Sequence, residues 1–462
     1  MEYWKRLCPS HISIPSPRPS QHQSNGLLFS QHCRLAHTDT EGDYVVARQQ
    51  TIPEGTLILQ EDPSVYQLHP SLISHRCAGC LMSLDGIKQP IPCRQSSCTW
   101  HLRYCSSICE SDYWFKVHAY VCAFFVVAQN PALLLAFQMW TSGNPMSLVS
   151  NLDQQTTDMY EKGATFMADL FRFSIHDPQA MQQDLVRYQA ILRCNGFGIQ
   201  RKWVSRDSVG MDTVATALYL QASKFNHSCH PNVLALFVDK TIQLRTLRPV
   251  TAGESLCISY GPLAANMPLH QRQHYLRDRY FFTCGCQACQ VVPDPSLPPS
   301  IDQVYLCPNC TYKRLVLKTP TCPQCHTTID WARILKIEGA IDNYEGDWEK
   351  VLQLQSSIYH DETLTLGKTY DQLARVHHLA NRSNEAIYCC KKSLSIVQSV
   401  YGPTSPEAAE EMFKLCGLYA TAGNRSRTKE WIKKTCDLYR LLGLDQQLKD
   451  DMDELDAMGR FI

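Results

Sequence analysis

The sequence predicts an α+β fold in which short strands are interrupted by metal-binding segments and followed by an all-helical C-terminal region. Three observations lead to this prediction. Short β-branched runs occur in residues 43–68 and again in 215–260, cysteines and histidines gather in dense blocks, and the chain after Trp331 has helical periodicity to its end. With 462 residues, 44% of them hydrophobic, the chain can fill the cores of roughly three domains.

Composition excludes several classes of protein. Lysine plus arginine and aspartate plus glutamate both number 44, so the net charge is zero and direct DNA binding is not expected. No apolar run reaches about 18 residues, and the N-terminus lacks the apolar middle of a secretory signal. We therefore expect no membrane association and a location in the cytoplasm and nucleus. In that setting the 23 cysteines, most of them in short-spaced pairs, indicate metal binding rather than disulfides.

The N-terminal half divides into four predicted segments. Residues 1–28, rich in Ser, Pro, His and Gln, predict a flexible leader without a fold. Residues 29–76 contain β-branched runs broken by a Pro-Glu-Gly sequence, which predicts two strands joined by a tight turn. A block of cysteines and histidines follows at 77–122, and helical patterning then dominates 123–212.

The second half returns to strands before it becomes helical. Two C-terminal stretches around Leu373 and Leu415 resemble each other, and each predicts a helical hairpin in an array of stacked helix pairs. The predicted segments are 213–262 with short strands, 263–292 and 293–330 with cysteine clusters, and 331–462 with helices.

The block at 77–122 holds eight potential metal ligands in four pairs. Thiolate and imidazole groups at such spacings suit two tetrahedral zinc ions. The block resembles a MYND finger, in which ligand pairs alternate between two zinc ions, and His101 lies close enough in sequence to compete at the second. By that resemblance one ion takes Cys77, Cys80, Cys105 and Cys109, and the other takes Cys93, Cys98, His118 and Cys122.

An Asn-His-Ser-Cys motif at 226–229 is followed by strand patterns and by a segment that ends at Tyr260. Alone, Asn226 and His227 would be ordinary turn residues before a proline. Together the two motifs resemble a SET domain, which implies that the chain draws them together around S-adenosylmethionine. Asn226 and His227 would then offer the cofactor hydrogen bonds.

A third motif follows Tyr280. The cysteines after Tyr280 resemble a post-SET segment, and the resemblance joins them to the cysteine of the 226–229 motif in a third zinc site. Loss of that metal should open the substrate channel as well as lower stability. The ligands of this site are Cys229, Cys284, Cys286 and Cys289.

The same resemblance assigns Tyr260 and Tyr280 to a lysine channel as catalytic residues, and Tyr260 and Phe282 to the cofactor. Two core tyrosines are the alternative interpretation. A water-poor channel favours the neutral lysine amine, which attacks the methyl group of the cofactor in line. Tyr260 orients the amine and need not be a strong base.

The N-terminal half of the expected cofactor site departs from the family pattern. A Gly-Arg-Gly or similar turn is expected before the first strand, and here the chain reads His-Thr-Asp-Thr-Glu-Gly-Asp. Gly42 can supply a close backbone approach to the cofactor. Rough alignment adds Asn151 to the cofactor contacts and Asn195 to the substrate channel.

A fourth cluster has the paired knuckles of a zinc ribbon. Three zinc ions are therefore expected, with this cluster as a fourth site, and it points to the fourth-member-like branch of the SET and MYND family. The remaining cysteines have no ligand pairing and are expected to be small buried apolar side chains. The ligands of the fourth cluster are Cys307, Cys310, Cys322 and Cys325.

The resemblance to the SET and MYND domain lysine methyltransferases covers about residues 40–445. It implies a split SET β-core with an inserted MYND finger, a post-SET zinc site and a TPR-like helical lobe that roofs a substrate cleft. The implied function is S-adenosylmethionine-dependent methylation of lysines on histone or non-histone proteins, with transcriptional repression as one setting, by a monomer. The alternative is a catalytically weak adaptor that recruits proline-rich peptides or co-repressors through the MYND finger and the repeats.

Overall fold

The structure is a computed structural model. The predicted leader at 1–28 and Asn151 lie outside the part of the chain that it describes. The described residues are 31–38, 42–48, 51–96, 98, 100–119, 122, 130–142, 148, 153–172, 175–204, 209–290, 301, 304–310, 312–313, 315–344 and 346–460.

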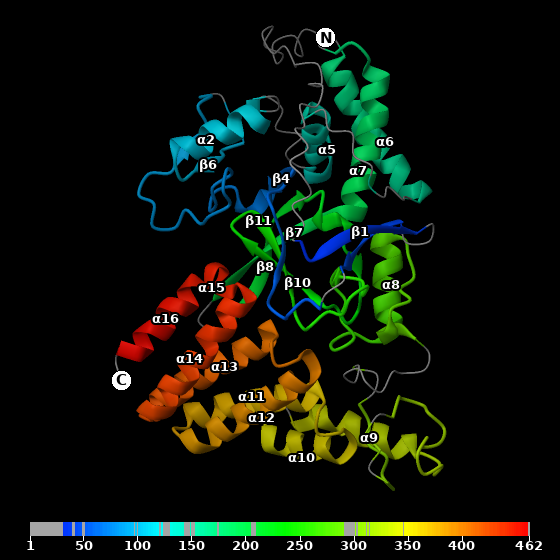
Figure 1. The fold of residues 1–462 in the computed structure, drawn as a ribbon, viewed down its shortest axis with the longest axis vertical. Helices are drawn as coiled ribbons and strands as arrows, with labels where there is room; N and C mark the ends of the chain where they lie inside the picture. The colour runs from blue at the N-terminus through cyan, green and yellow to red at the C-terminus, as the bar shows by residue number, and fades with distance from the viewer. Residues whose placement is uncertain are drawn as a thin grey trace.

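Strands occupy the middle of the molecule, with inserted segments above them in Figure 1 and the C-terminal helices below. The strands of the described residues form five small sheets, with orders β1-β2, β10-β11-β3, β12-β9, β4-β8-β7 and β5-β6. Their bounds are β1 Cys33–Thr38, β2 Gly42–Ala47, β3 Leu57–Glu61, β4 Val65–Leu68, β5 Ile91–Pro92, β6 Arg103–Tyr104, β7 Gly196–Val204, β8 Val209–Leu218, β9 Asn226–His227, β10 Val233–Val238, β11 Thr241–Thr246 and β12 Cys257–Ile258. The mixture of strands and helices confirms the predicted α+β fold.

The strands predicted in 29–76 form, but β2 and β3 do not pair with each other as a hairpin. β2 pairs with the preceding β1, and β3 pairs with β11, which lies far along the chain. The turn between them packs closely against Leu441 in the C-terminal lobe. A Cβ on Gly55 would collide with that side chain. Gly55 also has φ +70, a conformation that glycine adopts without strain.

Helices and a strand hairpin share the segment predicted to be a helical insert. α7 ends at Asn195, and its last residue is followed at once by β7, which pairs with β8. The predicted insert at 123–212 is therefore helical only in part, because alternating side chains from 196 onward pair across strands. Its helices are α5 Pro131–Ser142, α6 Gln154–Phe171 and α7 Pro178–Asn195.

The C-terminal lobe consists of antiparallel helix pairs, as the repeated pattern predicted. Leu373 and Leu415 occupy α11 and α13 and pack into one buried cluster. Gly402, with φ +94, ends the helix between them. No helix of the described residues is long and apolar enough to cross a membrane. The helices are α9 Trp331–Ile341, α10 Trp348–Ile358, α11 Leu364–Leu379, α12 Ser383–Tyr401, α13 Pro406–Thr421, α14 Arg425–Leu442, α15 Leu444–Gln447 and α16 Lys449–Arg460.

Candidate active site and metal centres

Four groups of cysteine and histidine side chains converge in the structure. In each group the ligand atoms all lie within 4.8 Å of one another. His118 belongs to the second group, whereas His101 is exposed and lies outside all four. The groups are Cys77, Cys80, Cys105 and Cys109; Cys93, Cys98, His118 and Cys122; Cys229, Cys284, Cys286 and Cys289; and Cys307, Cys310, Cys322 and Cys325.

The spacing of the sulfur atoms fits zinc. Four thiolates bound tetrahedrally at about 2.3 Å from one ion lie about 3.8 Å apart. The Sγ atoms of Cys80 and Cys105 are 3.5 Å apart, and those of Cys307 and Cys325 are 3.7 Å apart. Because thiolate and imidazole groups are the ligands that zinc prefers, the donor sets and their geometry both fit this metal.

The two groups of the predicted MYND finger sit beside the β-core. Tyr66 in β4 donates its hydroxyl hydrogen bond to the Gly79 carbonyl in the first metal knuckle, and Lys240 donates to the same carbonyl at 3.1 Å. A Cβ on Gly79 would lie 2.7 Å from the carbonyl oxygen of Cys109, so only glycine fits there without a shift of the backbone. The finger is thus fastened to the core through its backbone.

The post-SET group is shielded by a buried arginine that the sequence did not single out. Arg272 lies in α8 (Leu269–Tyr280) and is 1% exposed. Its guanidinium donates to the carbonyls of Met267 and Ala288 and lies 3.8 Å from the Cys289 sulfur. A Zn²⁺ ion with four thiolates carries a net negative charge, and this cation offsets it.

The 226–229 motif and the strand before Tyr260 meet in a parallel pair. Asn226 is opposite Cys257 in the β9-β12 register, and His227 is opposite Ile258. The Tyr260 backbone N–H donates to Nδ1 of His227 at 3.0 Å. Burial lowers the pKa of His227 to about 4, which keeps the ring neutral and Nδ1 available as an acceptor.

Three aromatic rings pack beside this crossing, next to the Cys229 metal group. The ring centroids of Tyr260 and Tyr280 are 4.9 Å apart, and those of Tyr260 and Phe282 are 6.3 Å apart. Phe281, at the end of α8, has φ +62, an unusual conformation for a large residue that turns the chain between Tyr280 and Phe282.

Both tyrosines remain protonated at neutral pH. Burial raises the pKa of Tyr260 well above its usual value, and burial raises that of Tyr280 to about 12. The Tyr260 hydroxyl donates to the Phe225 carbonyl at 2.9 Å, and the Tyr280 hydroxyl donates to the Tyr260 carbonyl at 3.3 Å. Neutral phenols held in this way orient a ligand by hydrogen bonds and apolar contact and are poor bases.

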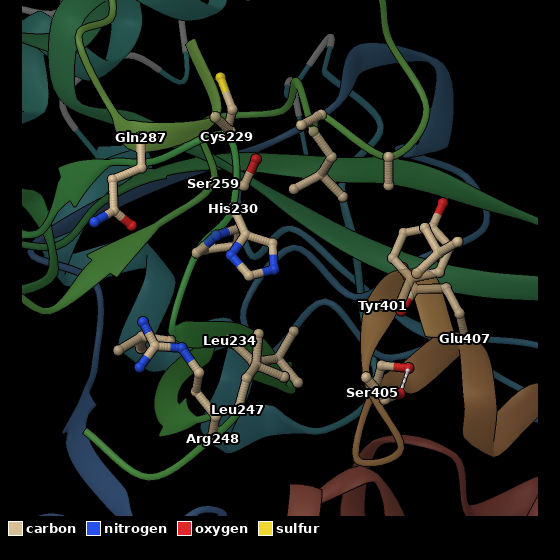
Figure 2. Close-up of a pocket in the computed structure, with 18 of the residues that line it drawn as sticks. Cys229, His230, Leu234, Leu247, Arg248, Ser259, Gln287, Tyr401, Ser405 and Glu407 are labelled. Atoms are coloured by element: carbon tan, nitrogen blue, oxygen red, sulfur yellow. Dashed lines mark hydrogen bonds between the residues drawn. The ribbon is translucent and has the colours of Figure 1, made fainter. Parts of the chain in front are cut away.

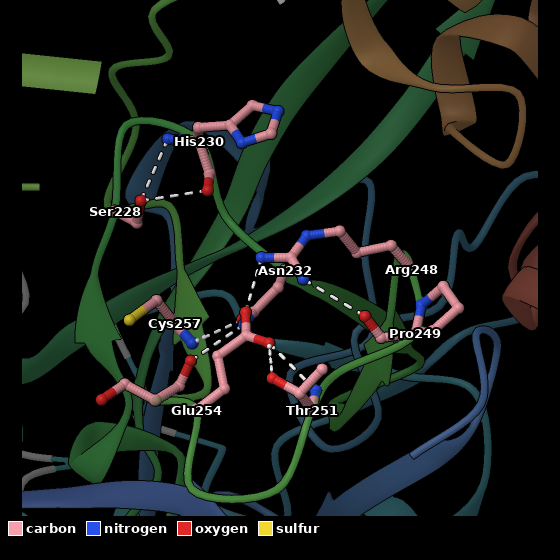
Figure 3. Close-up of polar contacts among 9 residues, drawn as sticks. Ser228, His230, Asn232, Arg248, Pro249, Thr251, Glu254 and Cys257 are labelled. Atoms are coloured by element: carbon pink, nitrogen blue, oxygen red, sulfur yellow. Dashed lines mark hydrogen bonds and ion pairs between the residues drawn. The ribbon is translucent and has the colours of Figure 1, made fainter. Parts of the chain in front are cut away.

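A polar network holds the turn that follows Cys229 (Figure 3). The Asn232 side-chain amide donates to Glu254 at 3.0 Å and to the Ser255 carbonyl at 2.9 Å, and its oxygen accepts from the Cys257 backbone N–H. Arg248 pairs with the same Glu254 carboxylate at 2.6 Å. Burial alone would raise the Glu254 pKa, but the hydrogen bonds from Arg248, Thr251 and Asn232 lower it overall. These hydrogen bonds hold the turn after the 226–229 motif against β12.

Gly42 lies close to the same crossing. It begins β2 with φ +67, and the neighbouring Asp43 pairs with Lys224 at 2.7 Å, two residues before Asn226. Gly42 and Asp43 are therefore close to the 226–229 motif. Asn195 ends α7, where its side-chain amide donates to the Ile191 carbonyl at 2.8 Å.

Cys194 is a second residue near this site that sequence reasoning treated as simple packing. Its charge, when ionised, would raise the pKa of both Tyr260 and Tyr280, which places it in the electrostatic environment of the pair. Its position one residue before Asn195 was the only available signal. Apart from that neighbour, nothing in the local sequence pattern indicated this proximity, because α7 and Tyr260 are far apart along the chain.

A large cavity separates the β-core from the C-terminal lobe (Figure 2). It has a volume of about 1150 Å³. One wall carries Cys229, His230 and Ser259, which adjoin the aromatic site in sequence, and the opposite wall carries Tyr401 and Glu407 from α12 and α13. The cavity therefore reaches the neighbourhood of Tyr260 and is closed on one side by the helical lobe.

Comparison with known proteins agrees with this geometry. Residues 42–261 match the SET domain family model, which defines the class of this chain as a SET-domain protein. Human protein-lysine N-methyltransferase SMYD4 is 25% identical over 260 residues, covering 51% of this chain and 32% of the relative. N-lysine methyltransferase SMYD2-B of Xenopus laevis is 21% identical and covers 77% of this chain and 92% of the relative.

The third relative is histone-lysine N-methyltransferase ASHR1 of Arabidopsis thaliana, 21% identical over 84% of this chain and 87% of its own length. The chain spans about a third of the length of the SMYD4 relatives. The SET match and these relatives together support placing the chain among the SET and MYND domain (SMYD) proteins.

Proposed function

We propose that this protein transfers a methyl group from S-adenosylmethionine to lysine side chains of other proteins, histone or non-histone. The observation that carries the proposal is the β9-β12 crossing, where the His227 ring accepts from the Tyr260 backbone and the rings of Tyr260, Tyr280 and Phe282 pack together. The names of the relatives, all lysine methyltransferases, support the same reaction.

The residues around the crossing fit a polar nucleoside-type ligand. Asn226 offers an amide with donors and an acceptor, and Phe282 offers a ring face. Among the described residues, a Cβ placed on Gly42 would meet nothing within 4 Å, so these residues leave space beside its backbone. S-adenosylmethionine, when bound, supplies an electrophilic methyl group on its sulfonium sulfur.

The chain itself then has to present a neutral lysine amine. Buried aromatic walls disfavour the ammonium form, because a charged group loses its hydration there. The phenols of Tyr260 and Tyr280 limit the orientation of the amine, and alignment supplies most of the rate. The cavity between the lobes is the proposed entry for the substrate segment, with the helical lobe as its roof.

Calorimetric titration with S-adenosylhomocysteine tests the cofactor part before any substrate is known. We expect one-to-one micromolar binding by the zinc-loaded protein and at least tenfold weaker binding by Asn226→Ala. A peptide array with radiolabelled methyl donor tests transfer, which Tyr260→Phe should reduce at least tenfold while the zinc content is unchanged. Absence of cofactor binding by folded, zinc-complete protein would exclude the enzyme.

A second candidate, a recruiting function of the predicted MYND finger, is favoured by its exposed apolar side chains. Ile108 is 79% exposed and Phe115 is 65% exposed. The Arg94 guanidinium lies over the rings of Trp114 and Phe115, 5.3 and 5.1 Å from their centroids. Such a surface suits a proline-rich peptide or a co-repressor segment. Binding of a proline-rich peptide that is lost in Ile108→Ala/Phe115→Ala but kept in Tyr260→Phe would support it.

We also propose that the chain lies close to the SMYD4 branch. The similarity to SMYD4 over half of the chain and the additional cluster at Cys307–Cys325 support this assignment. A SMYD4 structure without two knuckles in the corresponding position would count against it.

A further inference from the structure

A second hollow lies on the C-terminal lobe where α10, α11 and α12 meet, and it shares no residue with the cavity between the lobes. We name it the α10–α12 groove. It has a volume of about 470 Å³, and its floor is formed by buried side chains of α11 and α12. Its residues are Glu349, Leu352, Tyr370, Leu373, His377, Asn384, Glu385, Tyr388 and Cys389.

His377 is the first indication that the groove holds a ligand. Its side chain lines the groove on the same face of α11 as Tyr370 and Leu373, and it is 7% exposed. Within the described residues its Nδ1 atom is buried and has no hydrogen-bond partner. Buried polar atoms in proteins are nearly always paired, so an unpaired imidazole nitrogen at a groove favours a partner from outside the chain.

Two carboxylates give the groove a negative charge. Glu349 and Glu385 come from different helices, and in the described part of the chain neither forms an ion pair. Both line the groove together with Cys389, and after burial their charges are the next causes that raise the pKa of the Cys389 thiol. Lys392 lies beside the groove, with its Nζ 5.7 Å from the Tyr388 ring centroid.

Helix dipoles account for only part of this arrangement. Each carboxylate lies in the first turn of its helix, where negative charge is favourable in any case. The dipole explains neither the unpaired His377 nor the position of Tyr388, which is 57% exposed on the same groove. An exposed aromatic ring beside unpaired carboxylates is a surface that binds apolar and cationic side chains together.

We propose that the α10–α12 groove binds a short segment of a partner protein that carries a lysine or arginine beside an apolar side chain. The cation pairs with Glu349 and Glu385, and the apolar side chain packs on Tyr370 and Tyr388. A backbone N–H or hydroxyl of the segment donates to His377. The volume lies in the range of roughly 300–1,000 Å³ typical of ligand sites and admits a few side chains. None of these residues belongs to the proposed methylation site, so the interaction is independent of it.

Fluorescence anisotropy with the zinc-loaded full chain tests the groove. The probe is a fluorescein-labelled octapeptide of alternating leucine and arginine, and the comparison peptides alternate leucine with glutamate and serine with arginine. We expect the leucine–arginine peptide to bind at least tenfold more tightly than either comparison. Glu349→Gln/Glu385→Gln and Tyr388→Ala should each weaken it at least tenfold, and both change exposed side chains, so the fold is kept.

Asp453→Asn/Glu454→Gln is the matched control, because it removes two exposed carboxylates from α16 without touching the groove. Unchanged binding by this control, together with loss in the groove variants, supports the proposal. Equal weakening in both pairs would show non-specific attraction and overturn it. Equal binding by the wild type and Glu349→Gln/Glu385→Gln, or no binding by the folded protein, would overturn it as well.

Discussion

Most cysteines between residues 77 and 325 gather, in one case with His118, in groups of four potential metal ligands, whereas those of the helical lobe lie apart from any such group. Cys229 meets three cysteines from more than fifty residues away, with its sulfur 3.5 Å from that of Cys289. Cys390 and Cys416 are equally buried, but Cys390 packs in a cluster of leucines and tyrosines, and Cys416 packs with Cys436 and Leu455. The same residue type therefore serves as metal ligand or as apolar filler, and its spacing to other ligands decides which.

The two regions also differ in how they are held together. The β-core has strands as short as two residues in β9 and β12, which hydrogen bonds alone stabilise poorly. Metal groups and buried polar contacts fasten it across long sequence distances. In the helical lobe each helix packs on the next one in the chain, so apolar burial within helix pairs is sufficient.

The largest effect should come from a post-SET ligand. Cys229→Ser is expected to remove one zinc ion per chain and to destabilise the core on the order of 4–5 kcal/mol, because a metal that links distant segments is lost. Metal analysis and hydrogen exchange measure both consequences. Amides of α13 and α14 should keep their protection, and equal loss of protection in these helices would contradict the separation of the two regions.

A deletion in the core of the helical lobe should have the opposite pattern. Leu415→Ala removes a fully buried side chain between α13 and its neighbours and is expected to cost about 2–5 kcal/mol. Denaturant unfolding measures the loss, and the zinc content should not change. Met159→Ala, at an exposed position, is the control; a fall in zinc content in Leu415→Ala would show that the lobe supports the metal sites after all.

The polar network around Glu254 should contribute a smaller amount. Glu254→Gln removes a charge that accepts from Arg248, Asn232 and Thr251, and we expect a loss of about 1.5–3 kcal/mol in unfolding free energy with all zinc retained. Glu454→Gln, an exposed carboxylate on α16, should change stability by less than about 0.5 kcal/mol. Equal stability of the two variants would mean that the metal alone holds the 226–229 motif in place.

The smallest effect sharpens the comparison most directly. Cys416 and Cys322 are both 0% exposed, one in the helical lobe and one in the ribbon-like cluster. Cys416→Ala should cost only about 1 kcal/mol, because it removes one buried apolar atom. Cys322→Ala makes the same change but should also release one zinc ion. Zinc release from Cys416→Ala, or none from Cys322→Ala, is the outcome that this account does not allow.

Local spacing made the metal groups predictable. All sixteen ligands were expected, fifteen of them from short spacings, and each expected set of four converges in the structure. His118 was expected as a ligand as well, although His101 was nearer to its partner pair. Resemblance, rather than spacing, supplied the joining of Cys229 to the post-SET cysteines.

Contacts between distant segments that no motif joins could not be predicted. In the sequence nothing distinguishes Arg272 from an exposed helix arginine. The fold buries it beside the cysteine sulfur atoms of the post-SET group. The pairing of β3 with β11, rather than with β2, and the contact of Gly55 with Leu441 also depend on how the lobes pack. The roles of Tyr260, Tyr280 and the cofactor residues remain predictions that the proposed variants test.

The sequence by itself determined the α+β class, the short-spaced ligand pairs, the helix pairs and the motifs of the SET core, because each depends on residues that are close together in sequence. Tertiary structure decided which strands pair, which cation lies beside the metal groups, and where the cavity and the α10–α12 groove lie. The physical reason is that these features are formed by side chains from separate segments, whose meeting is set by the packing of the whole chain rather than by any local pattern.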